Sequence, residues 1–370
     1  ILFIEDRVPL QDVGAGLPRA NEILQAMVNA GFFVTFLPST HPHEEWSDVW
    51  SAVPQGVEVA TKIGLGGLEK FLEDRAGYYQ QIFISRPHNM KKLVSIIKKR
   101  PALTQDVRII YDAEAIFASR TLCKAELFGD EELKKTASDD RQEELALASY
   151  ANHVTAVNKL EAESFQTIGG PTVTVLGHTL PVSPTPAHFE HRAHIVFLGN
   201  LANEDSPNVD SYIWFVDEVM PLLGDLFGDQ SKFLVAGRNS ATSVHSRQTK
   251  ETELLGPVPD LETLFDQAKV FVAPTRYAAG IPHKVHQAAS LGVPIVATSL
   301  LARQLGWEHE KHLLVADTAE AFASAIQRLF ADAKLWMRLR EAALQKVSEE
   351  CNSEEFRTDV LRSIAPAMVP

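Results

Sequence analysis

The stretch between Val270 and Thr298 constrains the fold of this chain most, because its pattern is strand, loop, helix and second strand. Residues 270–273 form a short apolar run, which Pro274 cannot continue because proline lacks a ladder donor. Pro282 suits the first turn of a helix and Gly292 suits its end. The apolar run 293–298 then predicts a second buried strand. The stretch therefore predicts a β–α–β unit, from which parallel sheets are built.

The loop of this unit is a candidate anion site. The loop at the carboxyl end of the first strand presents free helix amides, which favour a phosphate, and Lys284 and Arg276 would add positive charge. The alternative is an ordinary β–α–β unit without a ligand, since the loop is poor in glycine. The pattern alone leaves both interpretations open.

Strands and helices alternate along the rest of the chain. We expect further strands at residues 2–4, 32–37, 57–60, 81–85, 107–111, 153–157, 172–176, 194–198, 232–236, 253–255 and 312–315. The alternation predicts an α/β protein with mainly parallel sheets.

The apolar periodicity lapses in one segment, where three prolines cluster with His188 and His191. We therefore predict two doubly wound Rossmann-like domains, at residues 1–182 and 194–350, joined by a linker at 183–193. Residues 351–370 would be a tail. One interpretation is that this tail is helical and packs back on the first domain. A ligand is expected in the cleft between the domains. The two histidines have no familiar set of metal ligands around them, so the linker surface is the preferred interpretation.

The composition excludes several classes of protein. With 370 residues, a formal net charge of −13 and a pI near 5.5, the chain does not suit bulk nucleic-acid binding. Cys123 and Cys351 are its two cysteines, so we expect no disulfide framework, no cysteine metal site and a reducing, cytoplasmic setting. No apolar run reaches the ~20 residues that span a bilayer, and we expect no signal peptide. Because the sequence opens in a strand without methionine, we expect a trimmed chain or a module of a longer protein.

A basic amphipathic segment, residues 91–100, has two interpretations. It is either a solvated helix face over the core or a peripheral contact with anionic lipid.

Several longer motifs occur in an order that resembles a known family. They are ILFIEDRVPLQDVGAGLPRANEIL, RIIYDAEAIFASR, ASYANHVTAVNKLEAESF, FLGNLANEDSPNVDSYIWFVDEV, LLGPVPDLETLFDQAKVFVAPTRYAAGIPHKV and GVPIVAT. With these motifs the chain resembles a bacterial retaining glycosyltransferase of family 4, which is group 1-like and has the GT-B fold of two facing Rossmann-like domains.

The resemblance implies transfer of a sugar from a nucleotide-diphosphate sugar to an acceptor with retention at the anomeric carbon. The acceptor would be a sugar or a lipid-linked or protein-linked group, in the synthesis of a surface polysaccharide or glycoconjugate. The donor would lie mostly on the second domain and the acceptor on the first. Helix amides and cations would stabilise the leaving diphosphate, so no metal and no cofactor are expected.

On the donor side, the resemblance implies that backbone amides of Gly280, Ile281 and Pro282 meet the diphosphate. Lys284 would be a phosphate cation with a catalytic role, and Arg276 would be a second one. Val258 would lie at the nucleobase, and Asn200 would face the same cleft.

On the first domain, the resemblance implies that Gly14 and Gly16 let the first loop approach the donor diphosphate or the acceptor. Asp112, as a catalytic candidate, and Glu114 would lie near the sugar. Arg19, Arg86 and His88 are the further acceptor-side candidates. The alternatives are a surface position for Arg19, a loop surface for His88 and a helix cap for Asp112.

The chain departs from the family at two positions. Members commonly carry two glutamates with seven residues between them and with a donor role, and here those positions hold Ala279 and Gln287. Gln287 can still bind ribose hydroxyls, but only through neutral hydrogen bonds. Two other functions therefore stay open. One is a catalytically degenerate module that binds nucleotide sugars or serves as a scaffold, and the other is a nucleotide-sugar epimerase.

Overall fold

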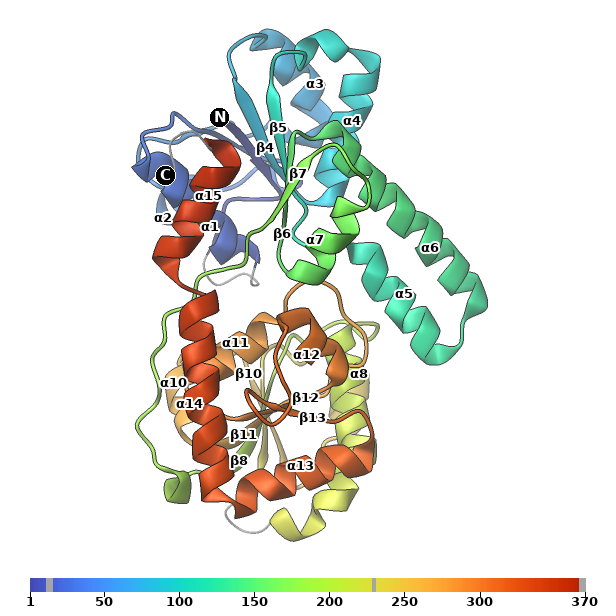
Figure 1. Ribbon diagram of the computed structural model, residues 1–370, viewed down its shortest axis with the longest axis vertical. Helices are drawn as coiled ribbons and strands as arrows, with labels where there is room; N and C mark the ends of the chain where they lie inside the picture. Colours follow the sequence, from blue (N-terminus) through green and yellow to red (C-terminus); the bar gives the residue numbers. More distant parts are fainter. Residues whose placement is uncertain (11–15, 228–230, 366–370) are drawn as a thin grey trace. The chain divides into compact units, whose positions relative to one another are not determined.

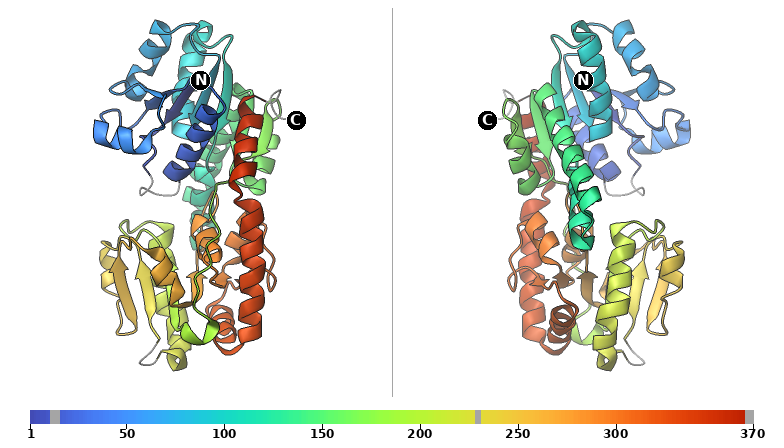
Figure 2. Two further views of the ribbon diagram at one scale, coloured as in Figure 1. Left: turned by 90° about the vertical axis from the view of Figure 1, so that its left-hand side faces the viewer. Right: turned by 90° about the vertical axis from the view of Figure 1, so that its right-hand side faces the viewer.

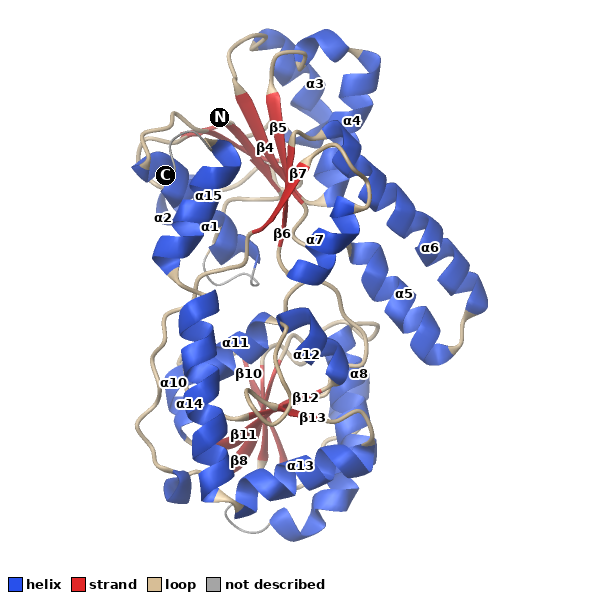
Figure 3. Cartoon of the chain, in the orientation of Figure 1, coloured by secondary structure: helices blue, strands red, loops and turns tan. Residues whose placement is uncertain are grey.

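The computed structural model describes residues 1–10, 16–227 and 231–365. The chain forms two compact units. Unit 1 comprises Ile1–Leu122, Glu132–Thr179 and Ser353–Pro370, and unit 2 comprises Cys123–Glu131 and Leu180–Asn352. The part of unit 1 that precedes the last segment of unit 2 ends at Thr179, whereas the sequence predicts an end of the first domain at residue 182. Each unit has a parallel sheet at its centre and helices around it (Figure 3).

The sheet of unit 1 has the strand order β3-β2-β1-β4-β5-β6-β7 within the described residues. The strands are β1 (Leu2–Glu5), β2 (Thr35–Pro38), β3 (Glu58–Val59), β4 (Gln81–Ser85), β5 (Arg108–Asp112), β6 (His153–Ala156) and β7 (Thr172–Val175). All neighbouring pairs are parallel, with Leu2 facing both Thr35 and Ile82. The strand order reverses between β1 and β4, so the loops that follow these two strands lead away in opposite directions.

Helices cover both faces of this sheet, because alternate strand residues are apolar on each face. The helical segments are α1 (Gly16–Asn29), α2 (Trp46–Ala52), α3 (Gly64–Asp74), α4 (Pro87–Lys99), η1 (Pro101–Leu103), α5 (Phe117–Phe128), α6 (Glu131–Ala146), η2 (Leu147–Tyr150), α7 (Lys159–Gln166) and α15 (Ser353–Ile364). The second half of α5, from Cys123, and the first residue of α6 belong to unit 2. Strand residues Phe3 and Phe83 pack with α1 and α15 on one face, and Ile4 and Ile84 pack with α3 and α4 on the other. Helix α15, from the predicted tail, lies beside α1 (Figures 1 and 2).

The sheet of unit 2 has the order β10-β9-β8-β11-β12-β13 in the described part of the chain. Its strands are β8 (His194–Leu198), β9 (Phe233–Ala236), β10 (Thr252–Gly256), β11 (Ala268–Ala273), β12 (Ile295–Ala297) and β13 (Leu314–Val315). The order reverses between the parallel neighbours β8 and β11. The predicted β–α–β unit is therefore β11, α11 and β12, next to this reversal.

The helical segments of unit 2 enclose its sheet in the same way. They are η3 (Phe189–His191), α8 (Pro207–Trp214), η4 (Phe215–Val219), η5 (Met220–Leu226), α9 (Thr242–His245), α10 (Leu261–Asp266), α11 (His283–Ser290), α12 (Ser299–Leu305), α13 (Ala319–Ala331) and α14 (Ala333–Glu350). Phe197 and Val272 pack with α8 and α13 on one face, while Phe271 and Ala273 pack with α11 on the other. Both sheets are thus doubly wound, as the sequence predicts.

The basic segment 91–100 lies mainly in α4, with Leu93 and Val94 buried against the sheet. Its exposed lysines are engaged in part: Lys91 pairs with Glu143 and Lys99 with Glu69. In the described ranges, no helix is both long and apolar enough to cross a bilayer.

Candidate functional site

The reversal of strand order between β8 and β11 marks the candidate site of unit 2. The loop after β8 leads to α8 and then to β9 on one side, while the loop after β11 leads to α11 and to β12 on the other. In doubly wound sheets, ligands bind at the carboxyl ends of the strands at such a reversal. The predicted donor residues lie largely on these two loops and on the helices that follow them.

Lys284 lies in the first turn of α11. Its ammonium group donates a hydrogen bond to Asn208 Oδ1 at 2.6 Å and lies 4.9 Å from the centre of the Phe197 ring. Burial lowers the pKa of Lys284 to about 8. No carboxylate of the described residues forms an ion pair with it. A half-buried cation without a counter-ion is costly, and binding of an anion such as phosphate would remove that cost.

Asn208, which sequence reasoning missed, connects the two sides of this site. It is the second residue of α8, and its Nδ2 group donates to the carbonyl oxygen of Asn200 at 3.3 Å. Its side chain therefore links the loop after β8 to Lys284 on α11. The signal in the sequence is its position directly after Pro207, at the start of a helix that follows a carboxyl-end loop.

Arg276, the second predicted phosphate cation, has different surroundings. Its Nε donates to Asp210 Oδ2 at 3.0 Å, and its guanidinium lies 5.6 Å from the ring centre of Phe128 and 6.0 Å from that of Trp214. Asp210 therefore compensates the charge of Arg276, in contrast to Lys284. A direct phosphate contact by Arg276 stays a prediction.

Of the other predicted donor residues, Gly280, Ile281 and Pro282 lie on the loop after β11, Gln287 lies on α11, and Val258 lies on the loop after β10. Gly280 has a φ of 78°, a backbone conformation that glycine adopts without strain, and it allows the loop to turn into Pro282, the residue before α11. Ile281 and Val258 are partly buried against the core below. Gln287 is half-buried, and its side chain makes no hydrogen bond to another described residue. Its predicted contact with the ribose stays a prediction.

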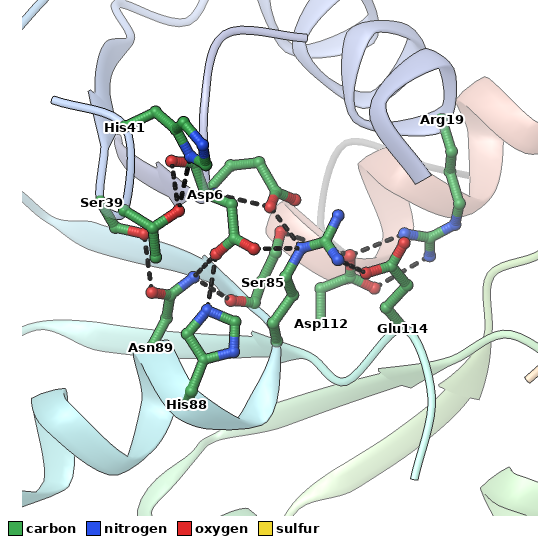
Figure 4. Close-up of polar contacts among 12 residues, drawn as sticks. Asp6, Arg19, Ser39, His41, Ser85, His88, Asn89, Asp112 and Glu114 are labelled. Atoms are coloured by element: carbon green, nitrogen blue, oxygen red, sulfur yellow. Dashed lines mark hydrogen bonds and ion pairs between the residues drawn. The ribbon is translucent and has the colours of Figure 1, made fainter. Parts of the chain in front are cut away.

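A second group of polar residues lies at the carboxyl ends of the strands of unit 1 (Figure 4). We define the carboxyl-edge cluster as Glu5, Asp6, Arg86 and Glu114. Arg86 Nε lies 2.6 Å from Glu5 and 3.4 Å from Asp6, and its Nη1 lies 2.9 Å from Glu114. Sequence reasoning missed Glu5 and Asp6 as site residues, although Glu5 is the last residue of β1 and Asp6 directly follows it. That position was the available signal.

The cluster is tightly packed and conformationally strained. Arg86 and Glu114 both have positive φ, at 74° and 57°, which is uncommon outside glycine. A Cβ atom on Gly16 would lie 1.8 Å from Glu114 Oε1, so any larger residue at this start of α1 would displace the Glu114 carboxylate from its present position. Burial and the neighbouring Glu5 raise the pKa of Glu114 to about 7, against the opposing effect of Arg86. Strain and a raised pKa at the end of a sheet are typical of functional sites.

The structure corrects the surface interpretation of Arg19. Its side chain is buried, and it donates to both carboxylate oxygens of Asp112, at 2.7 and 2.9 Å, and to the carbonyl oxygens of Leu176 and Gly177. Asp112 also accepts a hydrogen bond from Thr155, at 2.6 Å. Asp112 therefore holds Arg19 instead of capping a helix, and its buried oxygens are already engaged.

His88 lies in the first turn of α4, not on a loop. Its Nε2 is 2.6 Å from Asp6 Oδ1, and its side chain remains 46% exposed. Asn89 Nδ2 also donates to Asp6, and Ser39 donates to Asn89. These bonds connect the loops after β1 and β2 to the first turn of α4 (Figure 4). Gly14, the remaining predicted residue, lies outside the described residues.

Three comparisons relate the chain to known proteins. Residues 192–332, which lie in unit 2 and form less than half of the chain, match a family model described as "Glycosyl transferases group 1". A comparison with curated protein sequences gives no match. The similar solved structures include a sucrose-phosphate synthase from Thermosynechococcus elongatus, at 16% identity and a TM-score of 0.72, with 99% of this chain and 98% of that chain covered.

Two further solved structures extend the similarity. HepE of Anabaena, solved in complex with UDP-glucose, is 14% identical with a TM-score of 0.69, and 99% of each chain is covered. A glycosyltransferase from Rickettsia africae is 10% identical with a TM-score of 0.68, and 98% of each chain is covered. At such identities the similarity establishes the fold alone. The predicted fold class is confirmed: the chain has the GT-B fold, with two Rossmann-like α/β domains.

Proposed function

We propose that this protein is a glycosyltransferase that moves a sugar from a nucleotide-diphosphate sugar to an acceptor. The observation that carries the proposal is the half-buried ammonium group of Lys284, which has no carboxylate partner among the described residues and lies at the strand reversal of unit 2. A diphosphate supplies the missing negative charge. The amides at the start of α11 would bind it from the same side.

The match of residues 192–332 to the glycosyltransferase model supports this proposal, because that range contains both loops and the helices α8 and α11. Uridine nucleotides are the first donors to test, since HepE was solved with UDP and with UDP-glucose. Lys284 would hold the diphosphate and stabilise the charge that develops as the glycosidic bond breaks. Val258 would contact the base, and Gln287 the ribose.

The finer parts of the proposal follow the resemblance described above. We propose retention at the anomeric carbon, no requirement for a metal ion or cofactor, and a role in surface polysaccharide or glycoconjugate synthesis. The setting would be the cytoplasm, with peripheral membrane contact through the basic residues of α4. Flotation with anionic liposomes tests the membrane contact.

One observation favours a second candidate function. Ala279 and Gln287 stand where members of the resembled family commonly carry glutamates. A module that binds a nucleotide sugar without transferring it would need Lys284 but not those carboxylates.

A donor screen tests the proposal. Thermal shift and titration calorimetry with UDP-, GDP-, ADP- and dTDP-sugars should identify one donor that binds one-to-one. Release of the nucleoside diphosphate from that donor supports the transferase, and binding without release supports the module. If no nucleotide sugar binds, both candidate functions are rejected.

A further inference from the structure

Two tryptophans on α2 are unusually exposed. Trp46 is 52% exposed and Trp50 is 77% exposed, and their ring centres lie 6.1 Å apart with 32° between the ring planes. Val49 and Ala52, on the other side of the same short helix, are buried in unit 1. The helix is therefore anchored by one face and presents a pair of indoles on the other. Because tryptophan is usually well buried, an exposed pair indicates a binding surface.

This Trp46–Trp50 surface is connected to the carboxyl-edge cluster. The loop before α2 follows β2, and its residues Thr40 and His41 both donate backbone hydrogen bonds to the carbonyl oxygen of Asp6, at 2.9 Å. Glu44, two residues before Trp46, pairs with Arg7 through two hydrogen bonds at 2.9 and 3.0 Å. The helix that carries the two tryptophans thus begins at the edge of the sheet where a ligand of unit 1 is expected.

The charges of this region disfavour an anionic ligand. From Ser39 to Ala52 the sequence contains three carboxylates and neither lysine nor arginine. The neighbouring arginines are engaged with carboxylates, Arg7 with Glu44 and Arg86 with Glu5. An anionic bilayer or a phosphorylated ligand would therefore be repelled, since surfaces for such partners are rich in lysine and arginine.

The remaining polar groups suit a ligand rich in hydroxyls. Glu45 directly precedes Trp46 and Asp48 lies between the two tryptophans in sequence, and neither carboxylate forms an ion pair with another described residue. Their carboxylates can accept hydrogen bonds from hydroxyl groups. The C–H groups on the face of a pyranose ring carry a small positive charge and can stack on the negative face of an indole.

We propose that the Trp46–Trp50 surface binds an uncharged glycan and delivers it as acceptor to the carboxyl end of the unit 1 sheet. Each indole stacks on a sugar ring, and Glu45 and Asp48 accept hydrogen bonds from its hydroxyls. The proposed binding of a glycan depends only on the Trp46–Trp50 surface, whereas the role of that glycan as acceptor rests on the glycosyltransferase function proposed above.

Affinity electrophoresis of the full chain tests the binding step. Native gels containing dextran, laminarin or galactomannan should retard the wild-type protein, and gels containing anionic hyaluronan should not. Trp46→Ala and Trp50→Ala should each weaken the retardation about tenfold, as expected for the loss of an aromatic stack. Phe33→Ala is the matched control, because Phe33 is 59% exposed but precedes the amino end of β2, and its retardation should equal that of the wild type.

A second measurement uses the wild type alone, so it does not depend on whether the tryptophan variants fold. In the wild type, the neutral glycan that binds should protect tryptophan fluorescence from acrylamide quenching. The other tryptophans are more buried, so the protection would report on Trp46 and Trp50.

Three outcomes would overturn the proposal: no retardation and no protection by any neutral glycan, unchanged retardation in both tryptophan variants, or stronger retardation by hyaluronan than by every neutral glycan. Binding of the nucleotide sugars, UDP-glucose among them, to the wild type is measured separately. If glycan binding succeeds and every nucleotide sugar fails, the proposed enzymatic function is rejected while the glycan surface stands.

Discussion

Replacing Lys284 with alanine should weaken donor binding strongly, because the change removes a cation that no carboxylate of the described residues neutralises. The ammonium group is half-buried, has no carboxylate partner among the described residues, and is held by Asn208 at 2.6 Å. A hydrogen bond to a charged group contributes about 1.5–3 kcal/mol, so loss of one phosphate contact should raise the donor Kd roughly 10- to 150-fold.

The lowered pKa makes the same residue testable by pH. With a pKa of about 8, Lys284 is mostly charged at pH 7 and mostly neutral at pH 9. If only the charged form binds the diphosphate, the donor Kd should rise roughly tenfold between pH 7 and pH 9. Lys284→Arg keeps its charge over this range, so its Kd should change much less with pH.

Titration calorimetry at pH 7, 8 and 9 measures both effects with the donor that the screen identifies. Lys311→Ala is the matched control, because it removes an exposed lysine that pairs with Glu308 in the same unit. Changes in the ionisation of the ligand affect all variants equally and cancel in the comparison. A Kd for Lys284→Ala within threefold of the wild type, or an equal pH response in Lys284→Arg, would refute the placement of the diphosphate.

Four other predictions concern the donor, the buried ion pair, the cluster and the metal. If Gln287 meets the ribose, Gln287→Glu should tighten donor binding about fivefold, because a carboxylate forms the stronger hydrogen bond; weaker binding in calorimetry rejects that contact. Asp112→Asn should cost about 3 kcal/mol in urea unfolding by leaving buried Arg19 without its counter-ion, and combining it with Arg19→Gln should restore part of the loss. Because the folded-state pKa of Glu114 is about 7 and its ordinary value is 4.5, Glu114 should lower wild-type stability by up to ~3 kcal/mol as pH rises from 4.5 to 7. The slope should be smaller in Glu114→Gln, where the raised pKa of Glu5 still contributes, and an equal slope in both proteins counts against a raised pKa of Glu114. EDTA should leave donor turnover unchanged, and a loss that Mg²⁺ restores would show that the reaction needs a metal.

Much of the fold follows from sequence because most of its elements carry clear apolar patterns. The strands at 81–85 and 194–198 have the predicted bounds, since short apolar runs between turn residues leave little alternative. Helix α6 was harder to predict because Ala137 and Leu145 are its buried residues, so its sequence has no apolar stripe. The spacing of Leu261, Leu264, Phe265 and Ala268 suits one helix, but α10 ends at Asp266 and Ala268 begins β11.

Some residues of the candidate site could be predicted from the sequence, and others could not. Residues at the end of a strand or directly after it, such as Asp112 and Arg86, could be assigned to the carboxyl edge from sequence. Their partners could not, because Arg19 and Asp112 are 93 residues apart along the chain and meet through the fold. Asn208 was missed for the same reason, since its contact with Lys284 joins two helices on opposite sides of the strand reversal.

The most direct test of the proposed function is the release of nucleoside diphosphate from a panel of nucleotide sugars, with the anomer of the freed or transferred sugar followed by NMR. A retaining glycosyltransferase should release diphosphate from one donor and give a first-formed product with the donor's anomeric configuration, and Lys284→Ala should slow that release at least about tenfold. An inverted product would contradict retention, and binding of a donor without any release of diphosphate would contradict the proposed transferase.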